Sequence, residues 1–235
     1  MVKPFVPSAY ELVVLDRERP AFPHACAVAE RRPGDGVLFW TERNDRLEVA
    51  LLLEPDRPLL PTLEVFHVFA LAAGDALGTH TAPAFPLQIR FPHLLIFDIF
   101  ELARLRCRWP EVEGSQPPPW LVLALEADVA EPEEPGVHPE RITLMGAGVE
   151  VAQTAPIVES LAQYFLHWIA RWEEEGFAPI RAAWNLRCEN RGRTQTVRFG
   201  ERVAAGRVEG LDEAGRFVVG GSAISLLDVR SWLEA

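Results

Sequence analysis

Hydrophobic positions along the first 190 residues recur with two different periods, and the period separates expected helices from expected strands. Apolar residues three and four apart share one side of a helix, whereas alternation or a short apolar run is typical of a strand. Helical spacing predicts helices over Phe22–Glu30, from Thr62 through Leu77 with Gly78 as the C-cap, and over Ile157–Glu175 before Gly176. Strands are expected at Val37–Trp40, Leu47–Leu53, Leu94–Phe97, Leu102–Arg108 and Leu121–Leu125.

The first two strands should form a hairpin, and Leu94–Phe97 should pair with Leu102–Arg108. The segment TERNDR joins the first two strands, and the first helix should stop near Pro33-Gly34. From Thr194 the hydrophobic period falls toward two, with glycines between short apolar runs, which is typical of a small barrel. The pattern predicts a mixed layer of helices and strands over residues 1–189 and a small β-barrel domain over residues 190–235.

Two segments rich in proline interrupt the first domain. They are SQPPPW at Ser115–Trp120 and EPEEPGVHPER at Glu131–Arg141. Proline lacks a backbone donor and fixes φ, so both segments are expected to be exposed loops on either side of the Leu121–Leu125 strand.

Composition limits the function classes. Counting 23 basic and 34 acidic residues gives a net charge of −11, which opposes a general role on nucleic acid or anionic lipid. Three widely separated cysteines without C-x-x-C spacing argue against a disulfide framework or a structural zinc site. Neither a signal peptide nor a run of 18 uncharged apolar residues is found, so we expect a cytoplasmic protein that does not span a membrane.

Several stretches in one order resemble the catalytic domain of the biotin protein ligases and the related lipoate ligases. The segment IRFPHLLIFDIFELARLRC is similar to the family pattern K-W-P-N-D, a turn, then G-K-L-A-G-I-L, with Arg90 and His93 on the K and N of K-W-P-N. LLLEPDRPL at Leu51–Leu59, WLVLALEADV at Trp120–Val129 and RWEEEGFAPIRAAW at Arg171–Trp184 follow further family segments. The resemblance implies an α+β fold, in which a mixed, mainly antiparallel sheet is packed with helices in a ligase-like domain and is followed by a C-terminal SH3-like barrel.

Active members of that family make biotinyl-adenylate from biotin and ATP and then transfer biotin to a lysine of an acceptor protein. That chemistry needs fixed cationic donors around the carboxylate and the phosphates, and this sequence departs from the family there. TERNDR, beginning at Thr41, takes the place of the loop G-R-G-R-x-G-R, and Glu101 takes the place of the family lysine. Arg104 replaces the glycine that follows. The segment G-I-G-L-N becomes Ala124, Leu125, Glu126, Ala127 and Asp128, and S-T-N has no counterpart in LDRERPAFPHA.

The resemblance makes eight residues candidates for a ligand cleft and none a confident catalytic residue: Thr41, Arg90, His93, Glu101, Arg104, Ala124, Glu126 and Asp128. Each has a simpler explanation. Arg104, Arg106 and Arg108 alternate along one strand and should share a solvated sheet face, although an anion site is the alternative. Glu101 should pair with one of the nearby arginines, and His93 should be a packed or hydrogen-bonded residue.

Two further sets of residues have structural explanations. Cys107 occupies an apolar strand, so we interpret it as a buried structural thiol and not as the nucleophile of an octanoyl transferase. Phe165, Trp168 and Trp172 follow helical spacing and should belong to the core.

Three functional hypotheses remain. The first is a degenerate ligase that has lost adenylation and binds a small carboxylate ligand or a carrier-protein domain. The second is an active ATP-dependent ligase or acyltransferase with an altered substrate, and only this one requires biotin or ATP. The third is a regulatory or scaffolding partner. Without a helix-turn-helix ahead of the ligase-like part, DNA binding is not expected, and the oligomeric state is left open.

Overall fold

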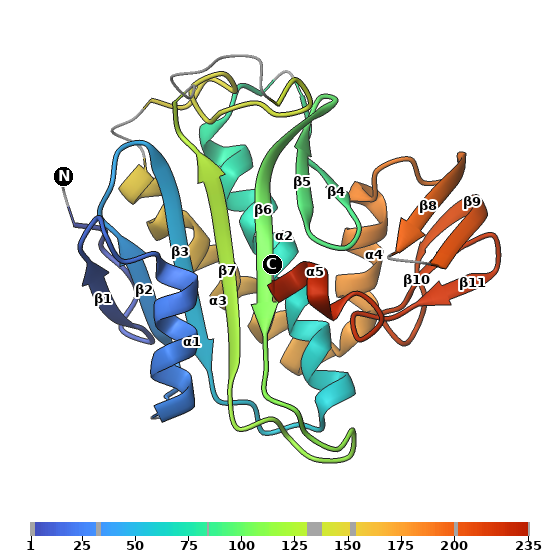
Figure 1. Cartoon of the computed structure of the whole chain (residues 1–235), viewed down its shortest axis with the longest axis horizontal. Helices are drawn as coiled ribbons and strands as arrows, with labels where there is room; N and C mark the ends of the chain where they lie inside the picture. Colours follow the sequence, from blue (N-terminus) through green and yellow to red (C-terminus); the bar gives the residue numbers. More distant parts are fainter. Residues whose placement is uncertain are drawn as a thin grey trace.

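The computed structural model describes residues 3–31, 34–83, 85–130, 138–150, 154–199 and 202–234. It contains a large mixed sheet between two helical layers, and a smaller sheet beside it (Figure 1). The N-terminal elements are β1 Glu11–Leu15, α1 Ala21–Arg31, β2 Val37–Thr41, β3 Arg46–Leu53, α2 Leu59–His80, β4 Gln88–Arg90, β5 Leu94–Phe97, β6 Phe100–Arg108 and β7 Leu121–Asp128. The remaining elements are α3 Thr154–Glu175, α4 Phe177–Arg187, β8 Thr194–Phe199, β9 Arg202–Leu211, β10 Phe217–Val219, β11 Ser222–Ile224 and α5 Arg230–Glu234.

The large sheet has the order β1-β2-β3-β7-β6-β5-β4. The β1–β2 pair is parallel and the other neighbouring pairs are antiparallel. This confirms the predicted α+β class and the mainly antiparallel sheet. The hairpin across TERNDR is also confirmed, because β2 and β3 pair along Val37–Trp40.

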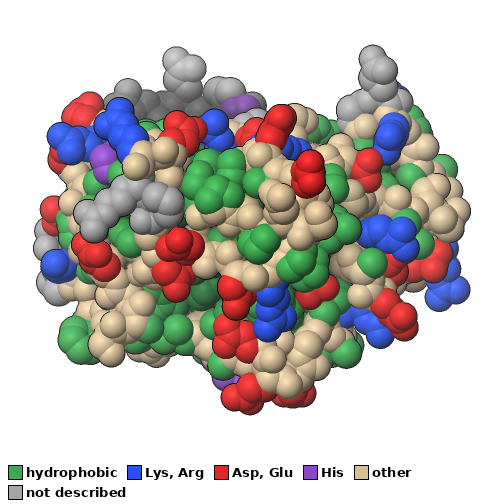
Figure 2. Space-filling view, turned by 90° about the horizontal axis from the view of Figure 1, so that it is seen from below, with side chains coloured by type: hydrophobic (Ala, Val, Ile, Leu, Met, Phe, Trp, Pro, Cys, Tyr) green, Lys and Arg blue, Asp and Glu red, His purple; other side chains and the backbone are tan. Residues whose placement is uncertain are grey.

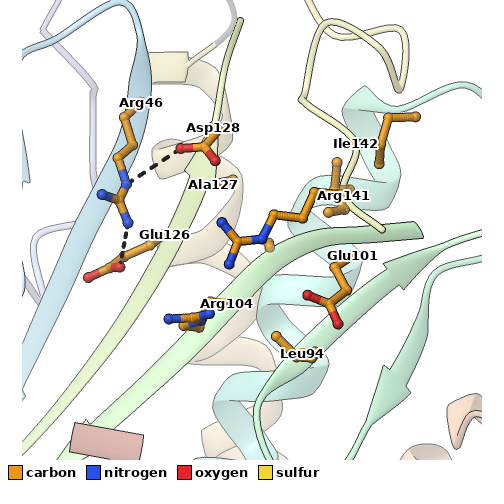
Figure 3. A pocket seen from close by; sticks show the side chains of 11 residues that line it. Arg46, Leu94, Glu101, Arg104, Glu126, Ala127, Asp128, Arg141 and Ile142 are labelled. Atoms are coloured by element: carbon orange, nitrogen blue, oxygen red, sulfur yellow. Dashed lines mark hydrogen bonds and ion pairs between the residues drawn. The ribbon is translucent and has the colours of Figure 1, made fainter. Parts of the chain in front are cut away.

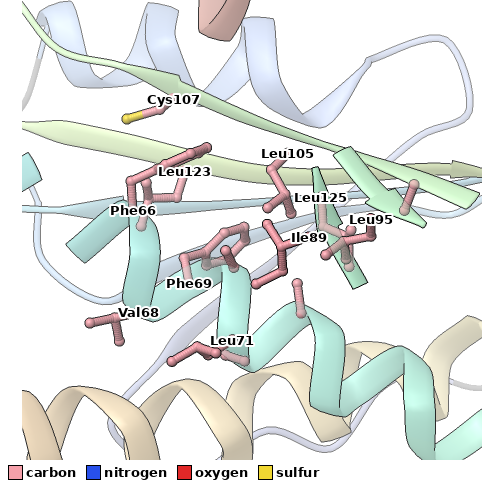
Figure 4. Packing of buried hydrophobic residues seen from close by; sticks show 14 of the residues in the cluster. Phe66, Val68, Phe69, Leu71, Ile89, Leu95, Leu105, Cys107, Leu123 and Leu125 are labelled. Carbon is pink, nitrogen blue, oxygen red and sulfur yellow. The ribbon is translucent and has the colours of Figure 1, made fainter. Parts of the chain in front are cut away.

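Alternation along each strand sends apolar side chains to α2 and α3 on one face of the sheet and to α1 on the other. Phe66 and Phe69 of α2 pack among Leu105, Leu123 and Leu125 of the sheet (Figure 4). On the opposite face, α1 covers a smaller apolar cluster. Phe165, Trp168 and Trp172 are buried at 3%, 7% and 5% exposure, which confirms that they are core residues.

Helix α2 is longer than the hydrophobic pattern predicts. It begins at Leu59 and ends at His80, so Gly78 lies inside the last turn and is not the C-cap. Glycine inside a helix costs about 1 kcal/mol relative to alanine, and the burial of the surrounding apolar residues offsets that cost. Among the described residues, α2 alone is long and apolar enough to span a membrane, but 72% of the relevant window is buried in the fold. It is a core helix.

Other boundaries also differ from the predictions. The strand expected at Leu121–Leu125 continues to Asp128, and the strand expected from Leu102 begins at Phe100. In both cases pairing with neighbouring strands extends the element past its apolar run into charged residues. The patterns missed β1 and β4, which are short edge strands, and the short helix α5.

The expected loop Ser115–Trp120 is mostly exposed, although Pro118 and Trp120 are buried. Most of the second predicted loop, residues 131–137, lies outside the described residues, as do Pro33 and the expected turn glycine Gly200.

The C-terminal sheet is antiparallel, with the order β11-β10-β9-β8. Two glycines permit a close approach of backbone to backbone in this sheet, because a Cβ on Gly206 would lie 2.5 Å from the Cα of Gly220. The two sheets meet through aromatic side chains, with Phe91 stacked on Phe217 at 4.6 Å between ring centroids. Helix α5 then returns to the large sheet and packs against β6 (Figure 1).

Candidate functional site

Strand register builds a charged surface on the α1 face of the large sheet. Glu48 of β3 lies opposite Glu126 of β7, and Glu126 lies opposite Arg104 of β6. Arg104 in turn lies opposite Leu94 of β5. Because residues two apart in a strand share a face, Asp128 lies on the same face as Glu126, beyond the area that α1 covers.

This surface is hollowed into a pocket with a volume of about 80 Å³. Small-molecule sites typically measure roughly 300–1,000 Å³, so the pocket in this state is small. Figure 3 shows that charged side chains from several strands and from the segment after β7 project into it. The lining comprises Arg46, Leu94, Glu101, Leu102, Ala103, Arg104, Glu126, Ala127, Asp128, Arg141 and Ile142.

Glu126 is the most enclosed acid of this pocket, with a residue exposure of 9%. Its two carboxylate oxygens accept hydrogen bonds from Arg46 at 2.8 Å and from Arg106 at 3.1 Å. Glu48, at 3% exposure, pairs with Arg43 at 3.2 Å and with Arg46 at 3.5 Å. Two acids directly opposite on neighbouring strands repel each other, so the arginines are needed to hold both charges in the sheet.

Glu101 lies on the other side of the pocket, as the second residue of β6. It accepts a hydrogen bond from Arg90 at 2.9 Å, which confirms the expected arginine partner. Arg90 also donates two hydrogen bonds to Glu189, at 2.6 and 2.9 Å, and these bonds raise its pKa. The backbone of Glu101 bonds to Glu140 and Ile142, which brings Arg141 to the pocket.

Arg104 and Arg141 are the cations of the pocket that are least neutralised. Within the described part of the chain, Arg104 has no carboxylate within 4.0 Å, and Arg141 approaches only Glu140, at 3.9 Å. Both residues line the pocket, and the guanidinium of Arg141 points into the space between Glu101, Glu126 and Asp128 (Figure 3). A guanidinium without a fixed partner can bind a carboxylate or phosphate in bidentate fashion, so the arrangement can accept a small anion.

Four of the eight candidate residues, Glu101, Arg104, Glu126 and Asp128, therefore line one pocket. The other four do not line it. Thr41 is buried and donates a hydrogen bond to the carbonyl oxygen of Arg19, and Ala124 is buried under α1. Arg90 contacts the site through its hydrogen bond to Glu101. His93 packs edge-on against Trp232 of α5, as expected for a packed residue.

The environment of His93 keeps its imidazole neutral. Burial, together with the smaller effect of the positive charges of Arg104 and Arg106, lowers the pKa of His93 to about 4. Its Nδ1 atom is buried and has no hydrogen-bond partner among the described residues. A neutral imidazole here can serve as an acceptor or a donor but carries no charge toward a ligand.

The face with Arg104, Arg106 and Arg108 is less solvated than the sequence predicted. The Arg106 side chain is 14% exposed. It lies over the ring of Phe22 in α1 at 4.1 Å and donates to the carbonyl oxygen of Glu234 in α5. The prediction is wrong for Arg106 because α5, which the pattern did not reveal, closes over this part of β6.

Cysteine chemistry has no support at this site. Cys107 is fully buried, and burial raises its pKa well above the usual value, which confirms the structural interpretation. Burial likewise raises the pKa of Cys26 to about 11. Neither thiol is a thiolate near neutral pH.

Sequence reasoning missed three charged residues of the site. Arg46 and Glu48 belong to β3, where alternation of polar residues with Leu47 and Val49 was the available signal. Arg141 lies in an irregular segment, and no periodic pattern could have placed it beside Glu101.

Comparison with known proteins gives consistent results. Residues 6–186 match the Biotin/lipoate A/B protein ligase family. A protein of Paracoccus denitrificans named Biotin--[acetyl-CoA-carboxylase] ligase is 30% identical over 179 residues, which are 74% of this chain and 73% of that protein.

Two solved structures share the fold. One is a biotin protein ligase-like protein of unknown function from Silicibacter sp., with a TM-score of 0.85 and 22% identity, covering 99% of this chain and 100% of that one. The other is the apo biotin protein ligase of Aquifex aeolicus, with a TM-score of 0.72 and 17% identity, covering 92% and 95%. The extent of the family match, together with the 30% identical relative, shows that this chain belongs to the biotin/lipoate A/B protein ligase family.

Proposed function

We propose that this chain is a non-adenylating member of its family, and that its pocket binds a small carboxylate through Arg104 and Arg141. The proposal rests on the position of the Glu126 carboxylate. This carboxylate is held by Arg46 and Arg106 inside the pocket, so the chain supplies its own anion where an adenylating enzyme would need free cations.

The charge balance supports this proposal. The pocket lining contains three arginines, Arg46, Arg104 and Arg141, and three acids, Glu101, Glu126 and Asp128, so its formal charge is zero. ATP adds several negative charges, and TERNDR offers little compensation because Arg43 already forms a two-bond pair with Asp45 and contacts Glu48. A monovalent carboxylate requires only one cation and is compatible with this balance.

The test is pyrophosphate release from ATP with biotin, lipoate or octanoate, with an active biotin ligase as the positive control. We expect no release by the wild type. Glu101→Lys should bind a carboxylate more tightly, because it removes one repelling charge, yet should still not release pyrophosphate. Substrate-dependent turnover by the wild type, or full ligation by the variant, would overturn the proposal.

An active ligase with an altered substrate is the second candidate. It is supported by the 30% identity to a protein named as a biotin ligase and by the two available arginines. Arg104→Ala should then abolish the thermal stabilisation given by the substrate. If Arg104→Ala and Arg90→Ala left the response to every carboxylate unchanged, this candidate would be abandoned.

The domain division, the partner and the location belong to the same proposal. We propose a ligase-like unit over residues 1–189 and an SH3-like unit over residues 190–235, which the separate four-stranded sheet supports. A carrier-protein domain is the proposed macromolecular partner, and the proposed location is the cytoplasm.

A further inference from the structure

A second pocket lies at the opposite end of the large sheet, on the face that carries α2 and α3. It is lined by Leu53 and Leu121, whereas the candidate site contacts the other ends of the same two strands at Arg46 and Asp128. The eight residues of β3 separate the two ends by roughly 23 Å. The volume of this second pocket, about 390 Å³, falls within the roughly 300–1,000 Å³ of small-molecule sites.

The interior of the second pocket is apolar and aromatic. Phe165 and Trp172 of α3 are buried and line it together with Tyr10. Trp172 donates its indole N–H to Glu64 at 2.8 Å, and the Tyr10 hydroxyl donates to the carbonyl oxygen of Ala162 at 2.9 Å. Because the polar atoms of both rings are already bonded, the rings offer apolar surface to a ligand.

The mouth of the second pocket is acidic. Asp35, Glu54, Asp56 and Glu173 line it, against the single cation Arg57, for a formal charge of −3. Glu54, Asp56 and Glu173 have no ion-pair partner among the described residues, and all three are exposed. Figure 2, which views the molecule from below, shows acidic side chains across the centre of this end of the protein.

The contact between Arg57 and Trp172 indicates that the aromatic side chains of this pocket can bind a cationic group. Its guanidinium lies 4.1 Å from the centroid of the Trp172 ring, a cation–π contact. Although acids surround the mouth, Arg57 is within 4.0 Å of none of the described carboxylates there. The three unpartnered acids therefore keep their negative potential, which attracts cations and repels anions.

We propose that this pocket binds an organic cation, namely a primary ammonium or guanidinium group carried on an apolar chain. The apolar chain would contact Phe165 and Trp172, and the cationic group would lie at the mouth between Asp56 and Glu173. A metal ion fits less well, because no group of three His, Cys, Asp or Glu side chains in the described ranges could hold one. The site lies outside the proposed carboxylate pocket and does not depend on it.

The test is calorimetry on the full chain with three probes of equal length: hexylamine, 1-hexanol and hexanoate. Hexylamine is protonated at neutral pH and should bind more tightly than hexanol. Because hexanoate can also bind the proposed carboxylate pocket, it is compared only by its displacement of bound hexylamine, which should be weaker than displacement by hexanol. Raising the salt concentration should weaken the binding of hexylamine and leave the binding of hexanol unchanged, because salt screens only the charged contact. Equal affinity for hexylamine and hexanol, or displacement of hexylamine by hexanoate as readily as by hexanol, would overturn the proposal.

Neighbouring acids of α3 provide a matched control. Glu173→Gln should lower the affinity for hexylamine about two- to fivefold, which is the range expected for the loss of one exposed charge pair. Adding Asp56→Asn should weaken it by a similar factor again. Glu174→Gln, which changes the net charge equally but does not line the pocket, should have no effect. Wild-type affinity in the double variant, or calcium binding that hexylamine cannot displace, would contradict an organic-cation site.

Discussion

At the scale of single residues, the buried carboxylate of Glu126 governs the candidate site. Glu126→Ala leaves Arg46 and Arg106 without their shared acid in a largely enclosed position. Removing one partner of a buried ion pair typically costs about 3–5 kcal/mol, so we expect a large loss of unfolding free energy in urea. Added formate should restore part of it, because formate can occupy the place of the lost carboxylate.

Glu101→Ala is the control for formate. Glu101 is more exposed than Glu126, and its partner Arg90 keeps two hydrogen bonds to Glu189. We expect a loss of about 1 kcal/mol or less, and a stabilisation by formate smaller than that of Glu126→Ala, because formate can then bind only the proposed carboxylate pocket and no vacated buried position. Equal stabilisation of the wild type and both variants by formate would show that no specific anion site forms at Glu126.

At the scale of elements, α2 is joined to the C-terminal sheet by His67. This histidine is fully buried, its Nε2 atom lies 3.0 Å from the carbonyl oxygen of Gly215, and burial lowers its pKa to about 4. The folded pKa is below the unfolded value of about 6.5, so the unfolded chain binds more protons between these values. The unfolding free energy should therefore fall as the pH drops from about 6.5 to about 4.

His67→Gln isolates this contribution. The amide can still donate to Gly215 but does not titrate. The slope of the unfolding free energy against pH, at its steepest between about pH 4 and 6.5, should therefore fall by about 1.4 kcal/mol per pH unit. The slope is measured by urea unfolding at several pH values. His93, whose pKa is also lowered to about 4, should keep its own contribution in the variant. An unchanged slope would mean that His67 is not protonated on unfolding in this range.

At the scale of the whole molecule, the two sheets are expected to unfold together. The Phe91–Phe217 stack and the return of α5 to β6 both join them. Thermal unfolding followed by far-UV circular dichroism and by tryptophan fluorescence should give coincident transitions. Phe91→Ala should lower the unfolding free energy by about 3–5 kcal/mol, and transitions that separate in the wild type would contradict this coupling.

Hydrophobic periodicity was sufficient for the main elements. The long helices α2 and α3 and the hairpin of β2 and β3 follow directly from it, because burial of one face imposes a period on the sequence. Periodicity could not reveal the short edge strand β4 or the five-residue helix α5. Such elements are stabilised by contacts with distant segments, and their few residues carry no repeat.

The sequence by itself determined the fold class, the family resemblance and the residue types at Glu101, Arg104 and Glu126, because each of these depends on residue type and local order. Only the tertiary structure decided that Arg46 and Arg106 neutralise Glu126, while Arg104 has no carboxylate partner in the described chain. Pairing of charges depends on strand register and on which distant segments cover a face. Those are properties of the folded chain, since β3, β6, β7 and α5 come together only when the sheet forms.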